Sequence, residues 1–148
     1  MINNLRDYFS LQEKPNLAVG VNLNTERLLK AANWVKTEYA LPSVSLNKKI
    51  SKLLIGNSAT TFSRKIIDWL SRKIKEIDED IILFTDIEIL FQPSLKLNPL
   101  TIFNQISRNT SLLVMWPGEF KNNTLSYASP EHAHYRTWAN PGVEIIQV

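Results

Sequence analysis

Three short apolar runs constrain the fold of this chain more than any other feature of its sequence. They are NLAVGV at residues 16–21, IILF at 81–84 and SLLVMW at 111–116. A short apolar run without regular polar alternation is typical of a strand that is buried on both faces, and such strands belong to parallel sheets covered by helices. The sequence therefore predicts an α/β fold built around a parallel sheet.

Helical segments separate these runs. Apolar residues recur at helical spacing in residues 24–39 and 59–77, where the second stripe consists of Phe62, Ile66, Leu70, Ile74 and Ile77. Shorter helices are predicted at 3–12, 48–54 and 99–107, further strands at 43–46 and 143–148, and a hairpin at 119–127. The alternation predicts a three-layer arrangement in a single domain over residues 1–148, because no linker or repeat interrupts it.

The composition is that of a globular protein. The 148 residues are 44% hydrophobic and 21% charged, which provides enough apolar material for a core. The chain has no cysteine, which excludes disulfides, cysteine-held zinc and thiol catalysis. No apolar stretch approaches the about 20 residues that span a membrane, and the N-terminus shows no signal sequence. We therefore expect a cytoplasmic protein without a membrane partner.

Positive charge is concentrated in the first half of the chain. The formal net charge is +3, but residues 1–76 carry 13 Lys and Arg against 6 Asp and Glu, whereas residues 77–148 carry 4 against 8. A basic half can attract nucleic acid or an acidic partner. Solvated helix faces are the simpler interpretation, because no aromatic residues are interleaved with the charges. The candidate DNA-binding residues are Lys48, Lys49, Lys52, Arg64, Lys65, Arg72 and Lys73.

The segment after the first apolar run occupies the position of a phosphate-binding loop. Such a loop reads G-x-x-x-x-G-K-[ST] between a strand and a helix. The corresponding residues here are GVNLNTER at 20–27, of which only Gly20 matches. Thr25 replaces the second glycine, Glu26 replaces the lysine, and Arg27 replaces the Ser or Thr that holds magnesium. The pattern predicts a degenerate nucleotide site, and an ordinary capped helix is the alternative.

Glu26 opposes phosphate binding through its charge. Two unit charges ~4 Å apart interact by roughly 4 kcal/mol at an effective dielectric of 20, so exchanging attraction for repulsion costs several kcal/mol. A carboxylate in the first turn instead complements the positive end of the helix, and Asn24 or Thr25 is a suitable N-cap. We therefore predict that this helix is capped by its own residues where a phosphate would otherwise bind.

Two acidic residues follow the strand predicted at 81–84. In a P-loop ATPase, an Asp at the end of this strand holds magnesium and a nearby acid activates the attacking water. The magnesium-binding Asp would directly follow the apolar run, at position 85, whereas Asp86 lies one residue further on. Glu88 is the candidate for the acid that activates water. Both share one face if the strand continues. They are candidate metal and catalytic residues, although solvent-facing acids at a strand end are the simpler interpretation.

The remaining strand end and the histidines suggest no chemistry. Many ATPases place a polar side chain after the strand at 111–116 to sense a phosphate, whereas this chain has Pro117 and Gly118. The only histidines, His132 and His134, stand in a predicted loop without further ligand candidates. Because the simpler interpretation is favoured for Asp86 and Glu88 as well, no metal site is predicted.

The second half of the chain resembles a known family. The segments TDIEILFQPSLKLNPLTIFNQISRNTSLLVMWPG at 85–118 and LSYASPEHAHYRTW at 125–138 are similar to BrxF, the small P-loop protein of type-three BREX phage-defence systems. That family has an intact phosphate loop, an Asp at the position of Thr85 and an Asn at the position of Pro117. This chain departs at all three and keeps Glu88 and Gly118. The resemblance implies a degenerate P-loop NTPase fold of the AAA+ (ASCE-like) type. We expect no helical lid, because the predicted strand at 143–148 closes the domain.

The resemblance also implies a role in anti-phage defence. The favoured hypothesis is a non-hydrolysing or weakly nucleotide-binding subunit that assembles or regulates a multi-protein complex, with no cofactor and with ATP and Mg²⁺ disfavoured. One alternative is a genuine small ATPase, in which Asp86 and Glu88 serve the metal and the water and Arg27 or Lys30 replaces the lysine. The other is a DNA-binding accessory protein. Expected partners are other proteins of the defence complex, and ring-forming relatives suggest a homo-oligomer.

Overall fold

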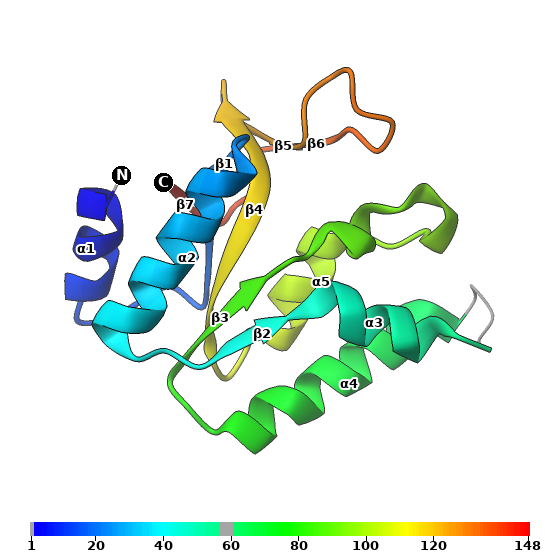
Figure 1. Cartoon of the computed structure of the whole chain (residues 1–148), viewed down its shortest axis with the longest axis horizontal. Helices are drawn as coiled ribbons and strands as arrows, with labels where there is room; N and C mark the ends of the chain where they lie inside the picture. Colours follow the sequence, from blue (N-terminus) through cyan, green and yellow to red (C-terminus); the bar gives the residue numbers. More distant parts are fainter. Residues whose placement is uncertain (1, 57–60) are drawn as a thin grey trace.

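The computed structural model describes residues 2–56 and 61–148 of the chain (Figure 1). Within them, a seven-stranded sheet consists of β1 (Leu17–Asn22), β2 (Ser43–Ser45), β3 (Ile81–Thr85), β4 (Ser111–Lys121), β5 (Thr124–Tyr127), β6 (Arg136–Ala139) and β7 (Glu144–Gln147). The helices are α1 (Ile2–Ser10), α2 (Thr25–Tyr39), α3 (Leu46–Leu54), α4 (Phe62–Ile77) and α5 (Pro99–Ile106), with 3₁₀ helices η2 (Glu88–Phe91) and η3 (Pro93–Leu95). No helix in these ranges combines the length and the apolar character needed to cross a membrane.

Five strands of the sheet are parallel and lie in the order β2-β3-β4-β1-β7. The strand β1 pairs with the central strand β4, from Leu17 opposite Leu112 to Asn22 opposite Pro117, and with β7 on its other side. β4 then continues beyond the parallel part and pairs antiparallel with β5, which pairs with β6. The carboxyl ends of the parallel strands therefore lie along one edge of the sheet.

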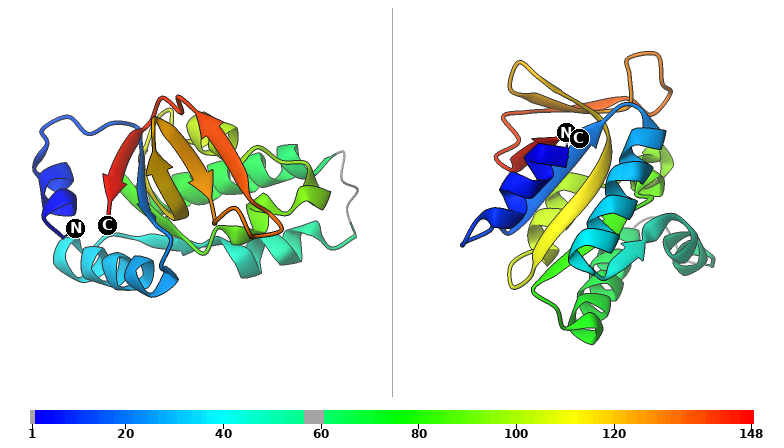
Figure 2. Two further views of the ribbon diagram at one scale, coloured as in Figure 1. Left: turned by 90° about the horizontal axis from the view of Figure 1, so that it is seen from above. Right: turned by 60° about the vertical axis from the view of Figure 1, so that its left-hand side comes forward.

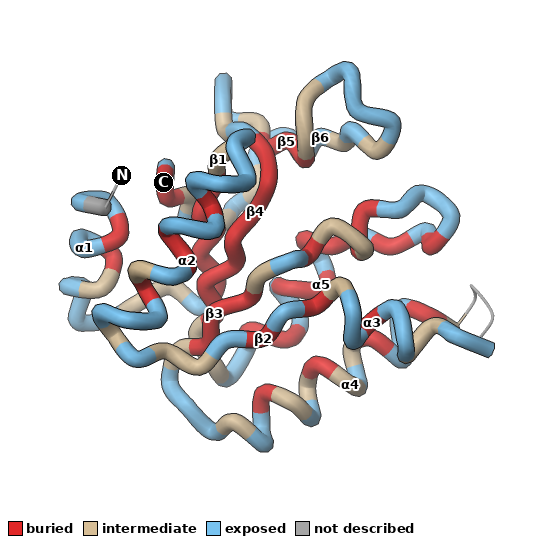
Figure 3. The backbone as a smooth tube through the Cα atoms, in the orientation of Figure 1, coloured by how far each residue is buried: buried red, intermediate tan, exposed pale blue. Residues whose placement is uncertain are grey.

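Helices cover both faces of the parallel part (Figure 2). Buried residues of α1 and α2 pack with Ala18 and Met115 on one face. Those of α3, α4 and α5 pack with Val19, Val21 and Val114 on the other. Buried positions therefore run along both sides of β1 and β4 (Figure 3). The predicted α/β class with a mostly parallel sheet is confirmed, and the arrangement is consistent with three layers.

The strongest helical stripe of the sequence forms α4. Phe62, Ile66, Leu70 and Ile74 are buried against the core, and Ile77 is half-buried at the end of the helix. The helix stops at Asp78, whose left-handed backbone (φ 50°) ends the run of helical hydrogen bonds. The first two residues of the predicted helix, 59–60, lie outside the described residues.

The expectation that a strand ends at Trp116 is wrong, because β4 continues to Lys121. Proline lacks an N–H donor and glycine is a strand breaker, so Pro117-Gly118 favours a turn by local rules. In the structure the Pro117 carbonyl accepts the Ala128 N–H at 2.8 Å, and Gly118 lies opposite Tyr127 in β5. Long-range pairing outweighs the local preference. The hairpin predicted at 119–127 is confirmed, with its second strand at Thr124–Tyr127.

The strand β6 and the 3₁₀ helix η2 are two further elements that the sequence did not predict. The loop expected around Tyr135 is followed by strand β6, whose Trp138 pairs with Leu125 of β5. The strand β3 does not extend through Glu88, because Asp86 has a left-handed backbone (φ 53°) and η2 begins at Glu88. Both elements are short, and short elements owe their stability to tertiary packing more than to intrinsic propensity.

Tyr8 of α1 carries a buried hydroxyl with no hydrogen-bond partner among the described residues. Its side chain is 3% exposed, and burial raises the pKa of Tyr8 to about 12. A hydroxyl that is buried without a partner costs about 1–3 kcal/mol. We expect Tyr8→Phe to increase the free energy of unfolding by about 1 kcal/mol in urea titrations at neutral pH. The matched variant Tyr39→Phe, at a half-exposed position, should change it by less than about 0.5 kcal/mol.

The raised pKa of Tyr8 also has a pH signature. Between pH 10 and 12 the native state keeps a proton that the unfolded chain has lost, so the free energy of unfolding falls as the pH rises through this window. Tyr8→Phe should make that fall shallower. An unchanged alkaline slope, together with unchanged stability at pH 7, would contradict the burial of this hydroxyl.

Candidate functional site

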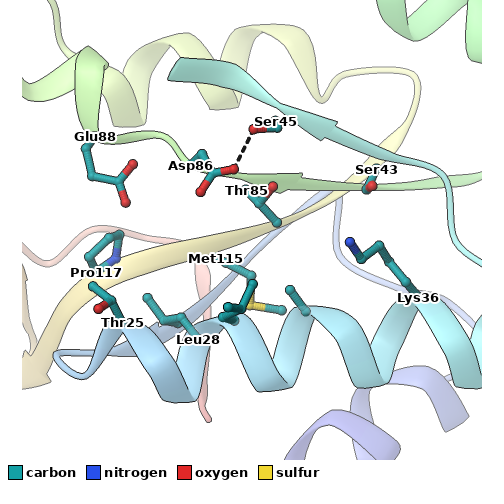
Figure 4. Close-up of a pocket in the computed structure, with 12 residues that line it drawn as sticks. Thr25, Leu28, Lys36, Ser43, Ser45, Thr85, Asp86, Glu88, Met115 and Pro117 are labelled. Carbon is teal, nitrogen blue, oxygen red and sulfur yellow. Dashed lines mark hydrogen bonds between the residues drawn. The ribbon is translucent and has the colours of Figure 1, made fainter. Parts of the chain in front are cut away.

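A pocket of about 210 Å³ opens beside α2, between that helix and the ends of β2 and β3 (Figure 4). One wall is the apolar flank of α2, and the opposite wall is polar. The lining residues are Thr25, Leu28, Leu29, Ala32, Lys36, Ser43, Ser45, Thr85, Asp86, Glu88, Met115 and Pro117. Ligands of parallel α/β sheets bind outside the carboxyl ends of the strands, so this pocket is the candidate site.

The connection between β1 and α2 consists of only two residues, Leu23 and Asn24. The Asn24 side-chain oxygen accepts hydrogen bonds from the backbone N–H groups of Glu26 (2.9 Å) and Arg27 (3.2 Å). The Asn24 N–H in turn donates to Asn22 Oδ1 at 2.8 Å. The prediction that the helix is capped by its own residues is confirmed with Asn24 as the N-cap. Glu26 lies in the first turn, as expected.

Gly20 lies inside β1, where it pairs with Met115 of β4 and Ile146 of β7. An added Cβ at Gly20 would stand 3.1 Å from the Met115 sulfur. The residue therefore contributes close packing within the sheet. It is not part of the connection between the strand and the helix. Thr25 is the first residue of α2 and borders the pocket.

The two acids after β3 are held by one side chain from the last residue of β2 and one from the start of α3. The Ser45 hydroxyl donates to Asp86 Oδ2 at 2.5 Å, and the Asn47 side-chain amide donates to Glu88 Oε2 at 2.6 Å. Asn47 Oδ1 also accepts the Ile89 N–H at 2.8 Å. These bonds join the segment after β3 to the start of α3. Each carboxylate is therefore an acceptor within the protein's own hydrogen-bond network.

Asp86 and Glu88 both border the pocket, although the reason differs from the one expected. A continuing strand would have placed them on one face, but β3 ends at Thr85. The left-handed residue Asp86 turns the chain, and η2 begins at Glu88. The turn brings the two carboxylates to one end of the pocket (Figure 4).

Glu88 also lies close enough to Tyr127 to act on its ionisation. Burial, and to a smaller extent the negative charge of Glu88, raise the pKa of Tyr127 to about 12. The phenol is therefore a neutral hydroxyl at physiological pH. Tyr127 stacks on Phe91, with ring centroids 3.8 Å apart, so Glu88 borders both the pocket and the aromatic core.

The cation that lines the pocket is Lys36. It lies at the end opposite Glu88, near Ser43 (Figure 4). Arg27 and Lys30, the cations considered from the sequence, do not line the pocket. A ligand in the pocket would meet a positive charge at one end, two carboxylates at the other and an apolar wall between them.

The seven basic candidates for DNA contact lie on two helices of the opposite layer. Lys48, Lys49 and Lys52 are exposed on α3. On α4, the exposed candidates are Arg64, Lys65 and Arg72. Lys73 is half-exposed, and its ammonium group lies 3.9 Å from the Glu76 carboxylate. The structure thus separates these residues from the pocket beside α2.

The histidines lie close together on the connection between β5 and β6. The ring centroids of His132 and His134 are 5.4 Å apart, and the His134 N–H donates to His132 Nδ1 at 2.9 Å. Over residues 2–56 and 61–148, no group of three or more His, Cys, Asp and Glu side chains is arranged to hold a metal ion. This hydrogen bond from the His134 N–H gives His132 a structural role in its turn.

Three polar residues of this region were missed by sequence reasoning, namely Lys36, Ser45 and Asn47. A usable signal was present, because Ser45 lies near the end of the short strand expected at 43–46 and Asn47 directly follows that strand. The rule that the ends of parallel strands meet at one edge applies to that strand as well. Lys36 had no comparable signal, since its place depends on how α2 crosses the sheet.

No protein-family model, curated protein or solved structure matches this chain.

Proposed function

We propose that this chain is a non-hydrolysing, P-loop-like domain that acts in the assembly or regulation of a BREX-type phage-defence complex. The observation that carries the proposal is the two-residue connection between β1 and α2, in which Asn24 already binds the first amide groups of the helix. The defence context comes from the similarity of residues 85–118 and 125–138 to BrxF.

The order of the parallel strands supports the P-loop part of the proposal. Their order, β2-β3-β4-β1-β7, is the one typical of AAA+ domains, in which the strand before the phosphate loop lies next to the last strand. The strand-connection-helix unit β1-α2 occupies the position of the phosphate-binding unit. The two acids after β3 lie on the same edge of the sheet.

The residues present do not fit a nucleoside triphosphate. A phosphate loop needs a run of backbone N–H groups that wraps the phosphates, and glycines that allow a close approach. Here the strand pairs as far as Asn22, which leaves only Leu23 and Asn24 before the helix. The N–H groups of Glu26 and Arg27 donate to Asn24, and Glu26 adds a negative charge. A phosphate would have to displace that cap and approach a carboxylate.

A second candidate function, a small ATPase with an unusual site, is favoured by one observation. Asp86, Glu88 and Lys36 border the same pocket, so carboxylates and a cation do face one volume. Against it, Ser45 and Asn47 already bind the two carboxylates. The two functions make opposite predictions for the affinity for nucleotide and for the effect of removing the Glu88 carboxylate.

Nucleotide binding is the direct test of the proposed function. In calorimetry with ATP and Mg²⁺, we expect no dissociation constant below about 1 mM, which corresponds to about −4 kcal/mol. Glu26→Lys restores a cation without restoring the amide cradle, so this variant should also fail to bind. Micromolar affinity of the wild-type chain would overturn the proposal. Micromolar affinity of Glu26→Lys alone would show that charge, and not the short connection, excludes the nucleotide.

Phage protection separates the two candidate functions in cells. Glu88→Gln keeps an oxygen that can accept the Asn47 hydrogen bond but removes the carboxylate. A non-hydrolysing subunit should protect as well with Glu88→Gln as with the wild-type chain in a plaque assay, whereas an ATPase should lose protection. Cells that lack this chain provide the unprotected reference for the plaque counts. Unchanged plaque numbers on deletion would contradict a role in defence.

A further inference from the structure

We infer that the outer faces of α3 and α4 form a surface that binds the phosphate backbone of duplex DNA. This surface lies on the layer opposite the pocket, so the inference goes beyond the proposed function and does not depend on it. It rests on the burial of the two helices, on their charge and on the kind of side chain that they expose.

The amphipathic pattern of each helix directs its basic residues outward. In α3, Leu46 and Ile50 are fully buried, and the exposed face carries Lys48, Lys49 and Lys52. In α4 the buried stripe faces the core and the exposed face carries Arg64, Lys65 and Arg72. Both helices pack on the same core and contact each other (Figure 1). The two helices that carry these basic residues are therefore neighbours on one layer of the molecule.

The two helices carry the protein's excess of positive over negative charge. Together, α3 and α4 carry eight Lys and Arg against two Asp and Glu. The remainder of the chain carries nine Lys and Arg against twelve Asp and Glu, so without these two helices the net charge would be negative. A concentrated positive field on a protein of mixed charge attracts polyanions and orients them toward that face. Arg64 and Arg72 are eight residues apart, which spreads the charge over about 12 Å along α4.

The exposed side chains favour a duplex over a single strand. Proteins that bind single-stranded nucleic acid combine basic residues with aromatic rings on which bases stack. α3 has no aromatic residue, and in α4 Phe62 is buried while Trp69 packs partly into the core. The surface therefore offers cations without stacking platforms. Such a surface can contact phosphates but cannot read unstacked bases.

Duplex binding with charge-neutralised variants tests this inference. The surface variant Lys48→Gln, Lys49→Gln, Lys52→Gln removes three cations from α3 and keeps its helix propensity. The matched control Lys96→Gln, Arg108→Gln, Lys121→Gln removes the same formal charge from exposed positions elsewhere. By fluorescence anisotropy at ~50 mM salt, we expect the surface variant to bind duplex DNA at least tenfold more weakly than wild type, and the control to bind within about threefold of wild type. The slope of log affinity against log salt should fall by roughly two to three units in the surface variant.

Several results would overturn the inference. They are the absence of duplex binding at ~50 mM salt, an equal loss in the surface variant and the control, and tighter binding to a single strand than to a duplex of equal length. Competition by polyglutamate that is as effective as competition by duplex at equal charge would indicate an acidic protein partner instead. Circular dichroism of all variants establishes that each is folded. A second surface variant, Arg64→Gln, Arg72→Gln, repeats the test on α4 if the first variant does not fold.

Discussion

Gly118→Ala is expected to destabilise the protein by at least about 3 kcal/mol. An ideal Cβ at this position would lie 1.8 Å from the Ser126 carbonyl oxygen and 3.0 Å from the Trp116 ring. The backbone of β5 would have to move, because Gly118 pairs with Tyr127 in the antiparallel extension. The Ser126 carbonyl also accepts the Trp116 indole N–H at 2.9 Å, so any displacement breaks a buried hydrogen bond.

Gly20→Ala is the matched control for this prediction. Its added Cβ would meet the Met115 sulfur at 3.1 Å and Val148 at 3.5 Å, and a methionine side chain can move aside. We expect a loss of about 1 kcal/mol or less. Urea unfolding followed by tryptophan fluorescence and circular dichroism measures both variants. Equal losses for the two glycines would contradict the close approach of β4 and β5 at Gly118.

Phe91→Ala should cost about 3–5 kcal/mol, because it removes a ring from the centre of an aromatic cluster. Phe91 is fully buried and stacks on Tyr127 with ring centroids 3.8 Å apart and an interplanar angle of 5°. It also forms T-shaped pairs with Trp116 and Trp138, with ring centroids 4.9 Å and 6.0 Å apart. The cluster joins η2 to β4, β5 and β6, so the same substitution should loosen the segment that carries Glu88.

Phe9→Ala is the comparison for Phe91. Phe9 stacks on Tyr39 at 3.9 Å but is only half-buried. The same chemical change should cost about 1 kcal/mol there, because less apolar area is buried. Thermal and urea unfolding measure both variants. A loss at Phe9 equal to that at Phe91 would mean that the aromatic cluster is not the centre of this part of the core. Phe91→Leu, which fills most of the volume, should recover much of the lost stability.

The main elements of the fold could be predicted from the sequence because their signals are local. The apolar runs at 16–21 and 81–84 correspond to β1 and β3 within one residue at each end, and α2 begins one residue after the predicted start at Asn24. Strong apolar periodicity of this kind survives in the folded chain because the same residues supply the core. Where local and long-range preferences disagreed, as at Pro117, the local rule predicted the wrong end of a strand.

The candidate site could be predicted only in part. The Asn24 cap followed from residue type and spacing, because a cap needs only the first turn of a helix. Asp86 and Glu88 were found because they follow a strand, but the path of the chain between them includes a left-handed residue, Asp86, that no local pattern predicted. Ser45 and Asn47 reach those acids across 41 residues of chain, through the parallel pairing of β2 with β3.

The sequence by itself determined the α/β class of this protein, the approximate position of its main helices and the self-capping of α2, since each depends on residues within a few positions of one another. Only the tertiary structure decided that no more than two residues join β1 to α2, that β4 extends into an antiparallel sheet, and that the basic helices α3 and α4 contact each other. These features depend on strand pairing and helix packing between distant segments, where the free energy of burial outweighs local preference.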